Sequence, residues 1–188
     1  MREKIMRKSI QLFEEKGFSQ TSISDIVNSL DVTKGTFYYY FHSKEEILMD
    51  IHQQYINHML KRQAELIEQT SLSNQEKLIE MMTILIDDIR DKGSSGRVFF
   101  RELRHLNEDN SQQVKEKRKA FRLNIEKIIQ DGIDAGEFKP DLRADMIAFG
   151  VLGVTNYSYN WFQPDGEVTS KQLAHLFADM VLHGIVYE

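Results

Sequence analysis

The sequence contains no cysteine, which excludes disulfide frameworks, thiolate catalysis and zinc sites built on cysteine. Proline and glycine are scarce, with 2 and 10 residues among 188, and this leaves little turn chemistry for a β-sandwich or barrel. The longest apolar run, Met146 to Val154, is far shorter than the roughly 20 residues that cross a bilayer. Residues 1–20 alternate charged and apolar side chains, unlike a signal peptide. We therefore expect an all-α, cytoplasmic protein without a membrane partner.

Charge is distributed unevenly along a chain whose net charge is −5. Residues 1–62 carry nine Lys and Arg against eight Asp and Glu, whereas residues 63–188 carry 15 against 21. Phosphate binding depends on where cations lie, so a local cluster suffices even in an acidic protein. The composition therefore permits a DNA-binding head on an acidic body.

Apolar residues recur at helical spacing along most of the chain, and cap signals separate the helices. Ser22 with Asp25, and Ser43 with Glu46, have the spacing of capping boxes. We expect the aspartates at 87, 88 and 91 to lie on a solvated helix face. The sequence predicts about nine helices, at about 2–16, 23–30, 34–40, 44–69, 74–92, 97–107, 112–135, 142–162 and 168–186, with a loop at 93–96.

Residues 21–46 read TSISDIVNSLDVTKGTFYYYFHSKEE and carry the most information about function. Two short helices joined by a tight turn, with a third helix beneath, describe a helix-turn-helix whose second helix enters the major groove. Lys34 places a cation at the start of that helix, and Gly35 removes a side chain so that backbone can approach DNA. Thr33 and Thr36 offer hydroxyls to phosphates or base edges.

Three consecutive tyrosines on this short helix exceed what a small core needs. Phenol hydroxyls suit phosphates, and the rings suit thymine methyls, so we expect Tyr38 and Tyr39 to contact DNA. For Tyr40, packing beneath the head is an equal alternative. Lys44 either contacts a phosphate, which we favour, or is a solvated residue at a helix start.

The stretches Ser9 to Phe18, Thr21 to Val27 and Val32 to Leu48 resemble the DNA-binding domain of the TetR (tetracycline-repressor) family of bacterial regulators. Asp31 departs from the pattern, because glycine is common there. The resemblance implies a DNA-binding domain at 1–45, a ligand-binding and dimerisation domain at 46–188, and a homodimer that reads palindromic double-stranded operator DNA. It also implies that Lys34, Gly35, Thr36 and Tyr39 face the groove, whereas Thr21, Ser22, Thr33, Tyr38 and Lys44 hold phosphates.

The helix expected at 142–162 is apolar nearly all round, which is typical of a buried helix. The last helix repeats apolar residues at Leu173, Phe177 and Met180. Two such terminal helices suit a four-helix bundle formed with a second copy, and packing within one chain is the alternative.

An effector cavity is expected among the aromatic residues of the middle helices and the penultimate one. The segment RELRH, residues 101–105, is either part of that cavity or an exposed helix with ion pairs. Trp161-Phe162 followed by Pro164-Asp-Gly166 resembles the sensor domains of relatives that respond to acyl-CoA thioesters, and multidrug-type ligands are the alternative. The candidate ligand-binding residues are Phe100, Arg101, Arg104, His105, Phe121, Phe149, Asn156, Tyr157, Trp161 and Phe162.

Other classes of function have weaker support in the sequence. The six histidines show no metal-binding spacing, and no glycine-rich phosphate loop follows a strand, so we expect no metal, no cofactor and no enzyme. A helical ligand-binding protein that does not bind DNA is the alternative from a different class.

Overall fold

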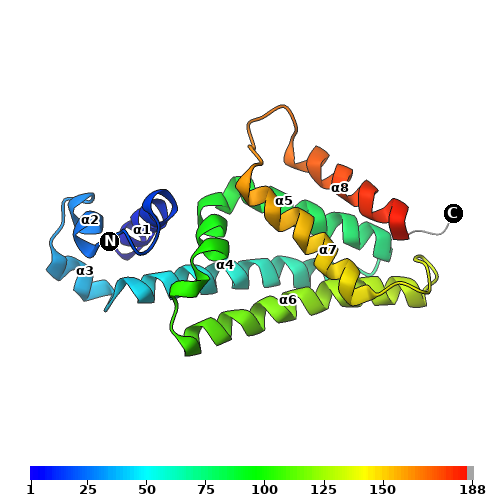
Figure 1. The fold of residues 1–188 in the computed structure, drawn as a ribbon, viewed down its shortest axis with the longest axis horizontal. Helices are drawn as coiled ribbons and strands as arrows, with labels where there is room; N and C mark the ends of the chain where they lie inside the picture. Colours follow the sequence, from blue (N-terminus) through cyan, green and yellow to red (C-terminus); the bar gives the residue numbers. More distant parts are fainter. Residues whose placement is uncertain (186–188) are drawn as a thin grey trace. The chain divides into compact units, whose positions relative to one another are not determined.

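The computed structural model describes residues 1–185, and it confirms the all-α prediction. Within these residues no β-strand forms, and eight α-helices with two short 3-10 helices take the place of the nine expected helices. No helix in this range has the length and apolar character needed to span a membrane. The elements in chain order are α1 (Arg2–Lys16), α2 (Ile23–Asn28), α3 (Lys34–Tyr40), α4 (Lys44–Ile67), α5 (Asn74–Arg101), η1 (Leu103–His105), α6 (Glu108–Asp134), α7 (Ala144–Tyr157), η2 (Ser158–Asn160) and α8 (Ser170–Ile185) (Figure 1).

Helix α1 buries one apolar face and ends at a glycine. Ile5 and Phe13 are fully buried, and Leu12 is nearly so. Gly17 then takes a φ of +85°, a backbone conformation that side chains other than hydrogen make costly. Its N–H donates to the carbonyl oxygen of Phe13 at 3.0 Å, which closes the helix.

The two helices of the helix-turn-helix begin at side-chain caps. The Ser22 hydroxyl accepts the Asp25 N–H while the Asp25 carboxylate accepts the Ser22 N–H, which is a complete capping box. Thr33 caps α3 by accepting the Thr36 N–H. Between them, Asp31 adopts a φ of +53°. A short polar side chain tolerates this left-handed conformation better than most, so the turn forms without the expected glycine.

The loop expected at 93–96 is wrong, because α5 continues through it. Gly93 and Gly96 lie inside the helix and are buried. The backbone leaves helical geometry only at Lys92, where φ is −130° and ψ is 18°. A kink therefore replaces the predicted break.

The chain divides into two compact units that are not continuous in sequence. The first contains Met1–Asn57 and Ser94–Glu116, and the second contains His58–Gly93 and the described residues from Lys117 onward. In the first unit, α1, α2 and α3 (blue in Figure 1) lie around the start of α4. The division into domains at residue 45 stays a prediction, since the units describe packing within the chain.

In the single chain, the second unit leaves one face of α7 and α8 exposed, and the burial of that face against a second copy stays a prediction. Ala148 and Val151 of α7 are fully buried. On the opposite side of α7, Phe149 and Tyr157 are more than half exposed, as is Leu176 on α8. The buried face holds α7 against its own unit, whereas the opposite face is apolar and open to solvent. The exposed large apolar residues of these two helices are Met146, Phe149, Tyr157, Leu176 and Met180.

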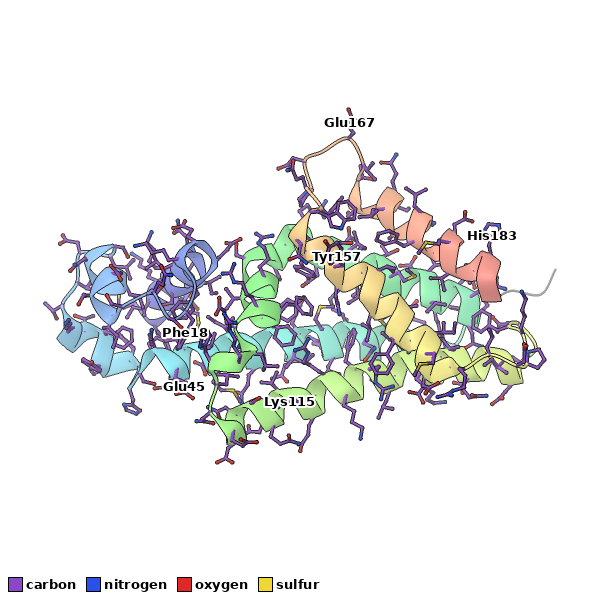
Figure 2. All side chains as sticks on the ribbon, viewed as in Figure 1. Phe18, Glu45, Lys115, Tyr157, Glu167 and His183 are labelled. Carbon is purple, nitrogen blue, oxygen red and sulfur yellow. The ribbon has the colours of Figure 1, made fainter. Side chains whose placement is uncertain are left out.

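Two carboxylates expected on a solvated face of α5 instead bond to other segments of the second unit. Asp88 is fully buried and accepts the Tyr159 hydroxyl at 3.2 Å, with His58 Nε2 at 3.3 Å. Asp87 accepts the hydroxyl of Ser170 at the start of α8. These contacts fix the chain on both sides of the loop 161–169, which carries Glu167 (Figure 2). Only Asp91 is exposed as expected.

Candidate nucleic-acid interface

Helix α3 is held by one buried aromatic ring and presents two others outward. Phe37 is fully buried and packs edge-on against Tyr38 and beside Phe41. Tyr38 is 52% exposed and Tyr39 is 81% exposed. An exposure of this size for a tyrosine leaves both its ring and its hydroxyl accessible to a partner. The predicted pair of DNA-contacting tyrosines thus lies on the outer surface of the unit.

The start of α3 is also open to solvent. Lys34 and Gly35 are exposed, and a side chain at Gly35 would meet only the Thr33 hydroxyl, at an ordinary 3.5 Å. Packing within the unit therefore does not require glycine at this position. The missing side chain leaves a gap beside Lys34 through which a phosphate or base edge can reach the backbone.

The hydroxyls that surround α3 are partly used inside the protein. Thr33 Oγ1 accepts the Thr36 N–H and lies 3.2 Å from Thr36 Oγ1, yet Thr33 remains exposed. Ser22 is exposed as well, and its hydroxyl donates to the Asp25 carboxylate at 2.7 Å. This hydrogen bond, with the one from the Ser22 N–H, lowers the pKa of Asp25. Both caps can still accept one further hydrogen-bond donor or contact a phosphate through the backbone.

Thr21 and Lys44 are placed differently from the prediction. Thr21 is buried, and its hydroxyl donates to the carbonyl oxygens of Leu12 and Gly17. Lys44 donates through its ammonium to the carbonyl oxygens of Phe18 (2.7 Å) and Thr21 (2.9 Å). Burial lowers the pKa of Lys44. Because both side chains serve the fold of the head, we leave Thr21 and Lys44 out of the proposed phosphate-binding set.

The candidate ligand-binding residues are divided between the two units. Phe100, Arg101, Arg104 and His105 belong to the first unit. Arg101 donates there to carbonyl oxygens of α1, and the His105 ring lies 5.3 Å from that of Phe18. The structure therefore gives this group contacts that the ligand prediction did not foresee. The other six candidates, Phe121, Phe149, Asn156, Tyr157, Trp161 and Phe162, belong to the second unit.

Within the second unit these six residues are unequally exposed. Phe121 and Phe162 are buried, whereas Trp161 is 49% exposed and packs edge-on against Phe162 and Phe177. Tyr157 ends α7 and is exposed (Figure 2). Phe149 lies under the guanidinium of Arg122, 4.7 Å from the ring centre, which is a cation–π contact that the sequence did not reveal. Buried members support the unit, and exposed ones are accessible to a ligand or another chain.

The capped pair α2 and α3, with basic and phenolic groups on its outer helix, defines a helix-turn-helix DNA-binding regulator. Comparison with known families agrees with this class. Residues 5–51 match the bacterial regulatory proteins of the tetR family, and residues 71–185 match the tetracyclin repressor-like C-terminal domain. The chain belongs to the TetR family of transcriptional regulators, whose members are not enzymes.

Similar proteins cover nearly the whole chain. The HTH-type transcriptional repressor KstR2 of Mycobacterium tuberculosis is 23% identical over 100% of this chain and 94% of its own length. The solved structure of this ketosteroid transcriptional regulator matches with a TM-score of 0.92, over 100% of this chain and 95% of that one. The fatty acid metabolism regulator protein of Bacillus subtilis is 26% identical over 96% of this chain and 93% of its own length. AibR, solved in complex with isovaleryl coenzyme A and operator DNA, has a TM-score of 0.85 at 21% identity. The match covers 95% of this chain and 96% of AibR.

Proposed function

We propose that this regulator is a cytoplasmic homodimer that represses transcription from a palindromic operator and is released by an acyl-CoA thioester. The observation that carries the DNA-binding part is the outer surface of α3, where Lys34, Tyr38 and Tyr39 are all exposed. Cations, phenols and open backbone are the groups that contact phosphates and base edges. The proposed DNA-binding set is Ser22, Thr33, Lys34, Gly35, Thr36, Tyr38 and Tyr39.

The exposed apolar face of α7 and α8 supports the homodimer. Single exposed apolar side chains are ordinary on protein surfaces, but five large ones on two neighbouring helices indicate a protein interface. On α7 they recur at positions 146, 149 and 157, which share one side of a helix. Two copies that meet through this face form a symmetric contact, and a symmetric pair of heads suits a palindrome with half-sites about 34–36 Å apart.

The acyl-CoA effector is supported by relatives and by the second unit. The names of two similar proteins refer to ketosteroids and to fatty acid metabolism, and AibR was solved with isovaleryl coenzyme A. In this chain, Trp161 offers accessible aromatic surface for an acyl group and packs edge-on against the buried ring of Phe162. A multidrug-type hydrophobic ligand is the second candidate, because the same rings fit any apolar molecule.

Release of the operator follows from linkage between two binding events. An effector that binds one arrangement of the dimer more tightly than the DNA-bound one must lower operator affinity, and DNA must lower effector affinity by the same factor. A typical coupling of about 1–3 kcal/mol changes affinity roughly 5–150-fold.

An electrophoretic mobility shift with DNA upstream of the chain's own gene tests repression directly. A repressor should retard this fragment and not a shuffled one, and its affinity should fall steeply between 50 and 200 mM salt, by about 10³-fold or more if six or more phosphates are contacted. Absence of any salt-sensitive complex with genomic fragments would favour the helical ligand-binding protein instead.

The effector is tested on the same complex with palmitoyl-CoA, using palmitate and free coenzyme A as controls. We expect only the thioester to release the operator, and Trp161→Ala to require a higher concentration. Release by rhodamine 6G with no response to palmitoyl-CoA would support the multidrug alternative. Equal responses of wild type and Trp161→Ala would place the ligand away from Trp161.

A further inference from the structure

The middle of α6 carries the densest group of cations in the second unit. Over the residues of that unit, 58–93 and 117–188, the sequence has 13 Lys and Arg against 17 Asp and Glu. Four of these 13 cations lie within the six residues 117–122, and no carboxylate interrupts them. Such a run creates a local positive potential on an acidic unit, and this potential attracts an anionic partner.

Three of the four cations are neighbours on the surface of the helix. Arg118 and Lys119 precede Arg122 by four and three positions, which is the spacing of side chains that meet on one side of a helix. Lys119 is exposed, and no ion pair or hydrogen bond holds its ammonium among the contacts of residues 1–185. An exposed ammonium without a partner carboxylate is available to an anion.

Arg122 is held in place beside an exposed aromatic ring. Its Nη1 donates to the Glu126 carboxylate at 2.6 Å, and its guanidinium lies 4.7 Å from the ring centre of Phe149 on α7. A guanidinium has five N–H donors, so this pairing leaves others for an anion. Leu123, the next residue of α6, is 42% exposed. The cations therefore border apolar surface that is open to solvent.

We propose that Arg118, Lys119 and Arg122 bind the phosphates at the nucleotide end of a coenzyme A thioester. Arginine binds phosphate through a planar fork of donors, and lysine binds it as a compact point charge. An adenine ring next to those phosphates finds apolar surface at Leu123, which lies on α6 and outside the exposed face of α7 and α8. The inference rests on the proposed function for the acyl-CoA effector and adds the subsite for its headgroup.

The position of this subsite along α7 allows one ligand to reach the proposed acyl site as well. Arg122 contacts α7 at Phe149, and Trp161 follows shortly after the last residue of that helix, Tyr157. From Phe149 to Tyr157 the helix rises about 12 Å, a distance that an extended pantetheine arm spans. Arg101, a ligand candidate from the sequence, instead donates to carbonyl oxygens of α1. We therefore assign the headgroup to cations of the second unit.

The test is calorimetric titration with palmitoyl-CoA and with S-palmitoyl-pantetheine, which lacks the nucleotide. Wild type should bind palmitoyl-CoA about tenfold more tightly or better, the effect of at least one charge-assisted hydrogen bond to phosphate. Lys119→Glu should lose about tenfold in affinity for palmitoyl-CoA, because repulsion replaces attraction, and should keep wild-type affinity for palmitoyl-pantetheine. Lys127→Glu makes the same charge change at an exposed lysine of α6 that pairs with Asp131, and it should bind both ligands as wild type does.

A mobility shift with the same ligands separates this inference from the proposed function. Palmitoyl-CoA binding that depends on Lys119 but does not release the operator would contradict the proposed effector and support the subsite. Release of the operator by palmitoyl-CoA with equal affinities in wild type and Lys119→Glu would overturn the subsite alone. The subsite is also overturned if wild type binds the two ligands equally or does not bind palmitoyl-CoA. Lys119→Ala serves if Lys119→Glu does not fold, with a smaller loss of about 3- to 5-fold.

Discussion

The helix-turn-helix and the outer face of α7 and α8 expose different chemistry. On α3 the exposed groups are an ammonium, two phenols and open backbone, all of which are well hydrated when free. On α7 and α8 the exposed groups include Met146, Phe149 and Leu176, which gain by leaving water. Under the proposed function, the first surface binds DNA through salt-sensitive polar contacts. The second surface binds another protein through apolar contacts, which do not depend on salt in this way.

The largest effect on operator affinity is expected from removing the exposed polar groups of α3. Lys34→Ala and Tyr39→Ala should each lower operator affinity about 10- to 100-fold, because one base or phosphate contact contributes about 1–3 kcal/mol. Sedimentation should show an unchanged oligomer, since α3 lies outside the apolar face. Lys115→Ala, an equal loss of charge at an exposed site of α6, serves as the control. Wild-type affinity in both α3 variants would show that DNA is read elsewhere.

A charged substitution tests whether the apolar face of α7 and α8 forms the dimer interface. Leu176→Glu should convert the proposed dimer to monomers at micromolar concentration, because a carboxylate would be buried twice across a two-fold contact. Operator affinity should fall with it, since one head contacts one half-site. Gln113→Glu adds the same charge to an exposed position of α6 and should leave the dimer intact. An unaltered sedimentation coefficient for Leu176→Glu would exclude this face from the interface.

The helices of the DNA-binding head could be predicted from the sequence because their start and stop residues act locally. Ser22 with Asp25, Thr33 before α3, and Gly17 after α1 each act within four residues, so spacing alone predicted their caps and stops. Asp31 shows the limit of such reasoning, since the left-handed turn forms there without glycine.

The second unit and the contacts of Arg101 with α1 depend on residues far apart in the sequence, which spacing does not encode. Asp88 and Tyr159 lie 71 positions apart, and Arg101 and Phe13 lie 88 apart. Read locally, Asp88 looked solvated, and Arg101 was compatible either with a ligand contact or with ion pairs on an exposed helix. Likewise Gly93 and Gly96 looked like a loop, because their burial inside α5 is decided by tertiary packing.

Two glycines are expected to serve different purposes, one in packing and one in DNA binding. A Cβ at Gly132 of α6 would overlap the ring of Phe138, so Gly132→Ala should lower the free energy of unfolding by about 1–3 kcal/mol. At Gly35 a methyl group finds room, so Gly35→Ala should keep or raise stability by up to about 1 kcal/mol while weakening operator binding. Thermal melts and mobility shifts on both variants measure this. A Gly35→Ala protein that melts early would mean that the glycine serves the fold.

The smallest expected difference concerns two capping boxes, one in each unit. The Ser22 side chain bonds Asp25 at the start of α2, and the Ser73 N–H and hydroxyl bond Glu76 at the start of α5; these bonds lower the pKa of each carboxyl. Because the folded pKa is depressed, the stabilisation is complete above the unfolded pKa, about 3.9 for Asp and 4.3 for Glu, and is lost as pH falls through the folded pKa. Ser22→Ala and Ser73→Ala should each lower the melting temperature by about 2–4 °C at pH 7 and by less at pH 3. Because α3 follows directly on α2, only Ser22→Ala should also weaken operator binding. Equal losses of operator affinity in Ser22→Ala and Ser73→Ala would mean that the cap of α5 supports the head as strongly as the cap of α2.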